Sequence, residues 1–484
     1  MKQCTLRVLD EVNIKFDDLD PALRRDIGNA LKFFLPYARH TPSYKLGRWD
    51  GCIKFFDTGG RSYFNLLETI LPIIDRHNYK IEVIDERIPF ESEFETITEE
   101  SFADTLWPKK HPLAGQPIML RDHQVEAINA FLENLQCIQE IATGAGKTMI
   151  TAALSKKVEP YGRSIVVVPN KSLVTQTEAD YINLGLDVGV FFGDRKEYNK
   201  THTICTWQSL NILMKKSKKV VDLDFTMADF IEDVVCVIID EAHQSKADAL
   251  KELLTGPFRH IPIRWGLTGT IPKEDVDRIT LKIGLGEVVN QISAKSLQEK
   301  GLLAQCDVNI LQLQDQVEFA NYPKELKYLT TDTKRMSVIS HMINNISEGG
   351  NTLILVDRIA SGELLKESLE GSIFIHGTMK GVTRQDHYDD VATATNKIII
   401  ATYGVAAVGI NIPRIFNLVL IEPGKSFVRV IQSIGRGIRV AEDKDHVQIW
   451  DITSSCKYAK RHLTTRKKFY NEAQYPHTVT KLNL

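Results

Sequence analysis

From residue 118 onward, the chain alternates short apolar runs with segments long enough to form helices. In the first part of this region the runs are SIVVVP (164–169), HTICT (202–206), VVCVIID (234–240) and IRWGLTG (263–269). Strands buried on both faces of a parallel sheet are typically such continuous runs, rich in β-branched residues. The alternation therefore predicts a doubly wound α/β domain with a parallel sheet.

The same alternation returns after residue 305. Its runs are TLILV (352–356), SIFIHG (372–377), KIIIAT (397–402), NLVLIE (417–422) and VQIWDI (447–452). A chain of 484 residues is also too long for one compact core, since domains usually hold about 100–200 residues. We therefore expect two α/β domains in tandem.

The N-terminal part has a different pattern. Alternating segments at 5–16, 52–57 and 79–84, with a helical stretch around 20–35, predict a small α+β domain. Between Asp85 and Asp104 there are eight acidic residues and one basic residue, and prolines follow, which indicates a linker. The expected domains are 1–115 with this linker, 116–295 and 296–484.

Composition excludes several classes of protein. A hydrophobic content of 43% and a charged content of 25% are ordinary for a soluble globular protein, and the net charge of −2 does not indicate a nucleic-acid partner. Seven scattered cysteines without a C-x-x-C pair argue against a disulfide framework or a zinc site. No apolar stretch reaches the ~18 residues of a membrane span, so we expect a cytoplasmic protein with no membrane partner.

The stretch IQEIATGAGKTMI (138–150) has the composition of a phosphate-binding loop. Gly144 and Gly146 would let backbone N–H groups turn toward phosphate oxygens at a helix N-terminus. Lys147 would reach the β- and γ-phosphates, and the Thr148 hydroxyl would ligate Mg²⁺. The alternative is a glycine-rich turn with a solvated lysine.

Two further motifs favour the nucleotide hypothesis. Asp240 and Glu241 follow an apolar strand, where one carboxylate can hold Mg²⁺ and the other can orient or deprotonate the attacking water. In the second α/β domain, VIQSIGRGIRV carries Gln432 with Arg436 and Arg439 on one helical face, and arginine suits a γ-phosphate. A solvated carboxylate pair and two exposed arginines are the alternatives.

Together these motifs resemble those of superfamily 2 helicases and translocases. The matching segments occur in the family's order: IATGAGKT (141–148), DEAH (240–243), LTGT (267–270), ATYGVAAVGINIP (401–413) and QSIGRGIR (432–439). The resemblance implies two tandem RecA-like motor domains that use ATP and Mg²⁺, the metal being held by Thr148 and Asp240. Ile141 departs from the family's usual alanine or glycine.

The resemblance also implies functional residues. The ATP-binding set comprises Arg121, Gln124 at the adenine edge, Thr143, Gly144, Ala145, Gly146, Lys147, Thr148 and Gly409. Thr268 and Thr270 would link hydrolysis to movement, or would simply form a turn. Contacts to DNA phosphates are expected at Asn170, Lys171, Thr206, Gln208, Thr378, Lys380, Thr402 and Tyr403.

Basic stretches are ambiguous. KKSKK (215–219) suits a solvated loop, and KYAKRHLTTRKKFY (457–470) suits either DNA or a helix covering the second domain. Near the N-terminus, YKLGRWDGCIKFFD (44–57) resembles a hairpin of UvsW-type phage DNA helicases, which implies DNA contacts at Arg48 and Trp49. Alternatively, Trp49 packs a small core and Asp50–Gly51 forms a hairpin turn.

The expected function is an ATP-dependent DNA helicase that remodels branched DNA by fork regression, junction migration, or D-loop and R-loop unwinding. It would act as a monomer on branched or forked duplex, with other replication or recombination proteins left open as partners. TGTIPKED (268–275) also resembles XPB-type proteins, so a duplex translocase without processive unwinding stays an alternative. An RNA helicase is a second alternative.

Overall fold

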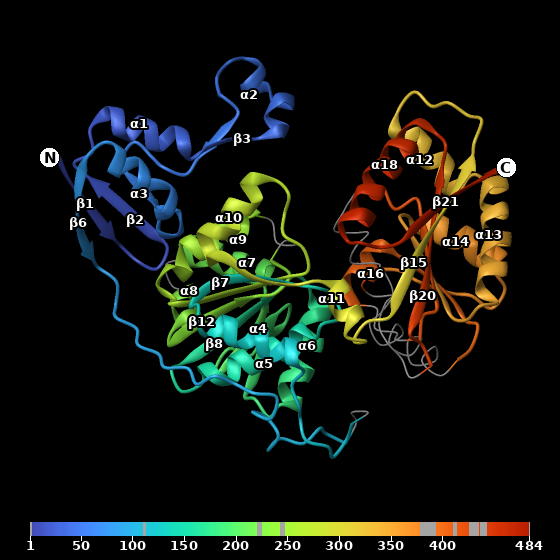
Figure 1. The fold of residues 1–484 in the computed structure, drawn as a ribbon, viewed down its shortest axis with the longest axis horizontal. Coiled ribbons are helices and arrows are strands. Elements are labelled where there is room, and N and C mark those ends of the chain that lie inside the picture. The colour runs from blue at the N-terminus through green and yellow to red at the C-terminus, as the bar shows by residue number, and fades with distance from the viewer. Residues whose placement is uncertain are drawn as a thin grey trace. The chain divides into compact units, whose positions relative to one another are not determined.

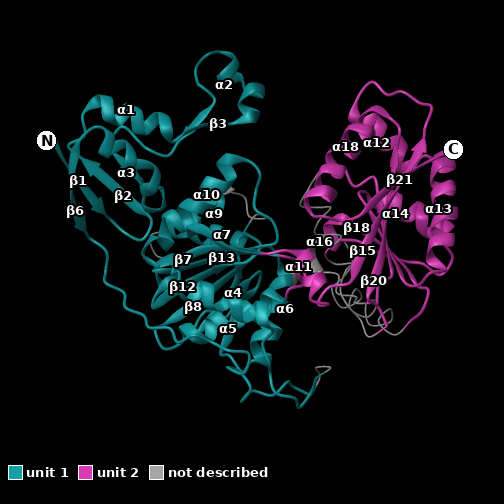
Figure 2. Cartoon of the chain, viewed as in Figure 1, with its two compact units in different colours: residues 1–141, 146–291 teal, residues 142–145, 292–484 magenta. Residues whose placement is uncertain are grey.

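The computed structural model describes residues 2–109, 113–219, 225–242, 247–377, 394–409, 414–424, 435 and 443–483 (Figure 1). The chain divides into two compact units (Figure 2). The first comprises Met1–Ile141 and Gly146–Gln291, and the second comprises Ala142–Ala145 and Ile292–Leu484.

The N-terminal domain belongs to the first unit and is built on a four-stranded sheet in the order β5-β2-β1-β6. Alternate residues of β1 face inward, so that Cys4, Leu6 and Val8 are buried against helices α1 and α3. The elements are β1 (Lys2–Val8), β2 (Asn13–Asp17), α1 (Pro21–Ala30), β3 (Lys32–Phe34), η1 (Pro36–His40), α2 (Pro42–Lys45), β4 (Cys52–Lys54), β5 (Arg61–Tyr63), η2 (Phe64–Leu66), α3 (Leu67–Arg76) and β6 (Tyr79–Asp85).

Two details of this domain differ from the sequence prediction. The helix expected to reach residue 35 ends at Ala30, because Lys32–Phe34 pair antiparallel with β4. Residues 35–51 join these two strands, so Asp50–Gly51 is the lead-in to β4 and not a two-residue hairpin turn. Trp49 does not pack the domain core: it is half-buried, and its indole N–H donates to the Cys52 carbonyl at 3.1 Å.

The first motor domain contains an eight-stranded sheet in the order β10-β9-β11-β8-β12-β13-β7-β14. Its central strands are parallel, and the short β10 is antiparallel to β9. The elements are α4 (Asp122–Leu132), β7 (Gln136–Ile141), α5 (Lys147–Val158), β8 (Arg163–Val168), α6 (Lys171–Asn183), β9 (Val188–Phe192), β10 (Arg195–Lys196), β11 (His202–Thr206), α7 (Trp207–Lys219), α8 (Met227–Ile231), β12 (Val234–Ile239), α9 (Ala247–Thr255), η4 (Pro257–His260), β13 (Ile263–Thr268), α10 (Asp275–Leu285) and β14 (Glu287–Ile292).

The second motor domain contains a seven-stranded parallel sheet in the order β17-β18-β16-β19-β20-β15-β21. The elements are α11 (Ala294–Glu299), β15 (Gln305–Gln314), α12 (Tyr322–Thr331), α13 (Thr333–Ser347), β16 (Thr352–Val356), α14 (Ile359–Ser368), β17 (Ile373–Ile375), β18 (Ile398–Thr402), α16 (Tyr403–Gly409), β19 (Asn417–Ile421), β20 (His446–Ser454), α18 (Lys457–Glu472) and β21 (His477–Asn483).

The two sheets share one strand order. Reading β14-β7-β13-β12-β8-β11-β9 in the first domain matches β21-β15-β20-β19-β16-β18-β17 in the second. The central strands are β12 and β19, and both are apolar and almost fully buried because helices cover both sheet faces. The predicted fold, two tandem doubly wound domains with a small N-terminal α+β domain, is confirmed.

The N-terminal domain packs on the first motor domain through α10. Ile283 of α10 belongs to the hydrophobic core of the N-terminal domain, with Val276 and Ile279 packed beside it. Asn65 donates to the Gln136 side chain at 3.1 Å, and the Glu11 amide donates to the Arg259 carbonyl at 3.0 Å. Within the described residues, no helix is long and apolar enough to cross a membrane.

Candidate ATP site

The phosphate-loop segment joins β7 to α5 through two glycines in the left-handed region. Gly144 has φ of +92° and Gly146, the residue before α5, has φ of +83°. A Cβ on Gly146 would lie 2.5 Å from the Gln124 amide nitrogen, so both conformation and space require glycine there. The turn delivers the chain into the N-terminus of α5, where backbone N–H groups favour an anion.

Ile141 is the position at which the loop departs from the usual consensus, and its surroundings show why an isoleucine is accommodated there. It is the last residue of β7, and its side chain is fully buried. Its carbonyl oxygen accepts a hydrogen bond from the Lys147 ammonium at 3.4 Å. The site therefore uses the backbone of Ile141, and the isoleucine side chain serves the core of the domain.

Lys147 and Glu241 form the centre of the site. The Lys147 Nζ lies 2.8 Å from Glu241 Oε1, and both side chains are nearly buried, with 10% and 12% exposed. Glu241 follows β12 with φ of +50°, an uncommon conformation for a non-glycine residue. This turn directs the Glu241 carboxylate to the first residue of α5.

Asp240 lies directly before Glu241 and is buried at the end of β12. One of its carboxylate oxygens accepts from the Glu241 amide at 2.9 Å. Burial, together with the neighbouring Glu241 charge, raises the pKa of Asp240 to about 7, while Lys147 opposes this rise. Two adjacent carboxylates facing one ammonium form a site that a bound cation would stabilise.

The LTGT segment (267–270) contacts Glu241. The Gly269 amide donates to Glu241 Oε2 at 3.4 Å, and Thr268 Oγ1 donates to the Thr270 carbonyl at 2.7 Å. The two threonines thus form the turn that was one of their predicted roles, and the turn contacts Glu241. A role in linking hydrolysis to movement stays a prediction.

Glu140 is a half-buried carboxylate beside the LTGT turn that the sequence analysis missed. It lies one residue before the end of β7 and accepts from the Ile271 amide at 3.3 Å and from the Gln291 side chain at 2.9 Å. Burial raises its pKa. A carboxylate inside the strand run QCIQEI was the signal that could have identified it.

Gln124 lies where the upstream motif predicts. It is the third residue of α4, only 6% exposed, and its side-chain oxygen accepts from the Arg121 amide at 2.9 Å. The same side chain borders Gly146. Arg121 precedes α4 and is exposed. Recognition of adenine by these two residues stays a prediction.

The residues present fit ATP with Mg²⁺. Glycines at positive φ, a helix N-terminus and Lys147 supply donors for phosphate oxygens, and the half-buried Thr148 supplies a hydroxyl in the first turn of α5. Thr148 and Asp240 would hold the metal. No group of three or more His, Cys, Asp and Glu side chains that could hold a metal ion occurs in the part of the chain that the structure describes.

The predicted DNA contacts in the first motor domain occupy helix beginnings. The Asn170 side chain caps α6 by accepting from the Leu173 amide at 3.1 Å, and Lys171 is exposed. Thr206 is buried before α7, and its hydroxyl pairs with Ser209 at 3.0 Å. Gln208 is exposed and donates to the Pro169 carbonyl at 3.1 Å. Contact with DNA stays a prediction for all four.

Other predicted residues are more scattered. Arg48 is exposed in the N-terminal domain, Thr402 ends β18, Tyr403 is buried at the start of α16, and Gly409 ends that helix. Thr143 and Ala145 lie in the phosphate loop. Gln432, Arg436, Arg439, Thr378, Lys380 and the motif residue His243 lie outside the described residues, and their roles stay predictions.

The two basic stretches are both helical. KKSKK forms the end of α7, and Lys218 pairs with Glu252 at 2.9 Å. The stretch 457–470 lies in α18, whose Leu463, Phe469 and Tyr470 are buried against the second domain. The covering role predicted for this helix is therefore present, and its exposed lysines leave the DNA role a prediction.

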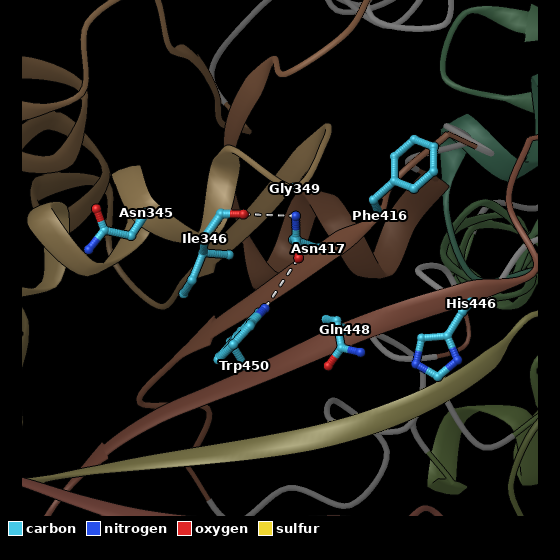
Figure 3. Close-up of a pocket in the computed structure, with 8 residues that line it drawn as sticks. All are labelled: Asn345, Ile346, Gly349, Phe416, Asn417, His446, Gln448 and Trp450. Carbon is cyan, nitrogen blue, oxygen red and sulfur yellow. Dashed lines mark hydrogen bonds between the residues drawn. The ribbon is translucent and has the colours of Figure 1, made fainter.

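A separate cavity of about 470 Å³ opens in the second unit (Figure 3). It lies at the amino ends of β19 and β20, away from the carboxyl strand ends where Glu422 follows β19. Asn417 connects its walls by donating to the Ile346 carbonyl at 3.1 Å and accepting from the Trp450 indole at 3.3 Å (Figure 3). The lining residues are Asn345, Ile346, Gly349, Phe416, Asn417, His446, Gln448 and Trp450.

Family comparisons agree with the geometry. Residues 117–273 match the domain model described as type III restriction enzyme, res subunit, and residues 334–441 match the helicase conserved C-terminal domain. The chain therefore carries the two domains of a helicase. The ATP-dependent enzyme class predicted from the motifs is thereby confirmed for this helicase.

Individual relatives cover different shares of this helicase. The ATP-dependent DNA helicase uvsW of Enterobacteria phage T4 is 24% identical in an alignment of 454 residues that covers 89% of this chain and 87% of the relative. The DNA 3'-5' translocase XPB2 of Sulfurisphaera tokodaii is 28% identical over 214 residues, 43% of each chain. The DNA-bound ATP-dependent Type ISP restriction-modification enzyme LlaBIII shares the fold with a TM-score of 0.56 and 14% identity, covering 78% of this chain and 32% of that one.

Proposed function

We propose that this helicase couples ATP hydrolysis to remodelling of branched DNA, including forks, four-way junctions, D-loops and R-loops. The observation that carries the proposal is the Lys147–Glu241 pair at 2.8 Å beside buried Asp240, at the mouth of a glycine loop. In this arrangement Lys147 would bind phosphate oxygens, and Glu241 would then be released to orient or deprotonate the attacking water. Mg²⁺ bound at Thr148 and Asp240 would offset charge on the transferring phosphate.

Two observations support the DNA part of the proposal: the similarity to a DNA helicase and the packing of the N-terminal domain on the first motor domain. The T4 relative, which is named as a DNA helicase, matches across 89% of this chain. The N-terminal domain is fixed to the first motor domain through α10, so any duplex held there would be held relative to the ATP site. Exposed Lys171, Gln208 and Arg48 are the residues that we assign to phosphate contacts.

The test combines hydrolysis with unwinding. Lys147→Ala should lower DNA-stimulated ATP hydrolysis by about 10²-fold or more, because it removes a positioned phosphate donor. The matched control is Lys157→Ala, a change of the same type near the other end of α5, which should keep the wild-type rate.

Wild-type protein should also separate strands of forks, four-way junctions and D-loops faster than those of linear duplex, and Lys147→Ala should not. Hydrolysis that survives in Lys147→Ala would contradict the ATP-site assignment. Equal unwinding of all substrates, or stimulation by RNA alone, would contradict the branched-DNA assignment.

A duplex translocase is the second candidate, and the XPB2 match favours it for the part of the chain that it covers. Such a motor would be stimulated by blunt duplex without releasing strands from forks. A duplex that carries a bound roadblock protein, added to the substrate panel, distinguishes it, since displacement of that protein would proceed without strand separation.

A further inference from the structure

A buried line of polar side chains runs through the first motor domain from the phosphate-loop helix. The Thr151 hydroxyl donates to the Thr148 carbonyl at 2.8 Å, and the Tyr181 hydroxyl donates to the Thr151 carbonyl at 3.1 Å. Tyr181 also lies 2.7 Å from the Ser155 hydroxyl. Tyr181 belongs to α6, so its hydroxyl joins that helix to two turns of α5.

The line continues into the sheet. Ser164 of β8 donates to Ser155 at 3.2 Å, and His202 Nδ1 lies 2.7 Å from the Ser164 hydroxyl. The other ring nitrogen of His202 lies 3.0 Å from a Glu159 oxygen, just beyond the end of α5. His202 is the first residue of β11, so this strand too is held to α5.

Counting protons fixes the direction of the hydrogen bonds between Thr151 and Ser164. The Thr151 carbonyl can only accept, so Tyr181 gives it its proton and accepts from Ser155. Ser155 therefore accepts from Ser164, and the Ser164 hydroxyl is in turn hydrogen-bonded to His202 Nδ1, with the donor set by the tautomer of the ring. A continuous chain of this kind has no spare donor, so removal of one hydroxyl leaves a neighbouring buried group unsatisfied.

We propose that Tyr181 and His202 are positioning residues that fix the ATP-binding helix α5 to α6 and β11. Two of the DNA contacts assigned above depend on these elements: Lys171 begins α6, and β11 leads directly into α7, whose second residue is Gln208. Tyr181 lies near the far end of α6 from Lys171, so a small tilt at Tyr181 displaces Lys171 across about 15 Å of helix. The line of hydrogen bonds thus couples the position of the nucleotide-binding helix α5 to the positions of the residues that contact DNA.

All five inner residues are buried, at 0–1% exposure: Thr151, Ser155, Ser164, Tyr181 and His202. Thr151 bonds the backbone carbonyl of Thr148, and none of the hydrogen bonds described above reaches Lys147, Asp240 or Glu241. Their effect on the reaction is therefore indirect, and it rests on the proposed DNA-stimulated hydrolysis.

The test separates coupling from catalysis. Tyr181→Phe should keep the basal rate and the KM for ATP within about two-fold but lower the stimulation by DNA about ten-fold, a loss in the range of known coupling effects. Tyr161→Phe is the matched control, because it removes a hydroxyl that bonds the linker carbonyl of Glu93 outside this line. It should retain wild-type stimulation.

Ser155→Ala provides a second variant that interrupts the same line from α5. The double variant with Tyr181→Phe should lose no more stimulation than the stronger single variant, since both break one chain. Unchanged stimulation in both single variants, or equal loss of basal and stimulated rates, would overturn the proposal. Absence of DNA stimulation in the wild type would instead overturn the proposed function.

Discussion

The two motor domains carry different ion pairs at the carboxyl ends of their matching central strands. In the first, Asp240 and Glu241 follow the central strand β12, and Lys147 from the first turn of α5 faces them. In the second, Glu422 follows the matching strand β19 with φ of +43°, close to the +50° of Glu241. Here the cation comes from Arg335 in the first turn of α13, whose Nη2 lies 2.9 Å from Glu422.

The surroundings of the two cations differ. Arg335 is fully buried and also donates to the Leu329 carbonyl at 2.6 Å, while its Nε lies 3.3 Å from Asp315. Asp315 follows β15, the strand that matches β7, and so stands where the first domain begins its phosphate loop. Thr453 donates to Glu422 at 3.2 Å, and Ser454 donates to Asp315.

This contrast shows how one architecture can serve hydrolysis or stability. At the first edge, Lys147 and Glu241 are each slightly exposed, so a bound ligand can replace one as the partner of the other. The second edge is filled by a guanidinium that is always charged and that satisfies both carboxylates. We infer that the first edge binds nucleotide, whereas the second is a structural ion network.

The largest expected effect comes from breaking that network. Arg335→Met should destabilise the second motor domain by about 3–5 kcal/mol, because it leaves Asp315 and Glu422 as buried acids without their cation. Native-state hydrogen exchange of β16, β19 and β20 measures the loss. Lys334→Ala, an exposed neighbour on α13, is the control and should change protection by less than about 0.5 kcal/mol.

If Arg335→Met left the exchange of these strands unchanged, the network would not be structural. A loss of protection confined to α13, without the strands, would also contradict it.

The second effect is a pH dependence of stability. Burial raises the pKa of Glu422 to about 7 although Arg335 opposes it, whereas the unfolded carboxyl titrates near its usual value of 4.5. The folded state thus holds the proton more tightly, and this contribution to stability is lost as the pH rises from about 4.5 to about 7. At 1.36 kcal/mol per unit, the loss is about 3 kcal/mol.

Glu422→Gln removes this titration. The stability advantage of wild type over the variant should be larger at pH 5 than at pH 8 by about 2 to 3 kcal/mol, as measured by urea unfolding at both pH values. Glu348→Gln, at the exposed end of α13, should follow the wild-type profile. An advantage that is constant with pH would show that Glu422 does not titrate in this range.

Much of the fold could be predicted because buried strands are distinct in the sequence. The run 352–356 is strand β16, and 202–206 is strand β11. Edge strands were missed: β14 (EVVNQI) and β21 (HTVTKLN) have neither a continuous apolar run nor a strict alternation of polar and apolar residues, and β5 is only three residues long. The helix α3 was missed as well, since Pro72 interrupts its pattern.

The site was predictable only where residues share a contiguous motif. Lys147, Asp240 and Glu241 were identified, and the structure brings Lys147 and Glu241 together. Arg335 was not identified, although NLVLIE ends in an acidic residue as VVCVIIDE does, which was a usable signal for a second edge. The Tyr181–His202 line depends on contacts among four elements, and no local pattern in the sequence records it.

Nucleotide binding tests the central contrast most directly. Isothermal titration with a non-hydrolysable ATP analogue and Mg²⁺ should give one site per chain, and Lys147→Ala should weaken it by about 10²-fold. Glu422→Gln should bind as wild type does, because its edge holds a structural arginine. A second nucleotide per chain, binding that survives in Lys147→Ala, or binding lost in Glu422→Gln would contradict the account.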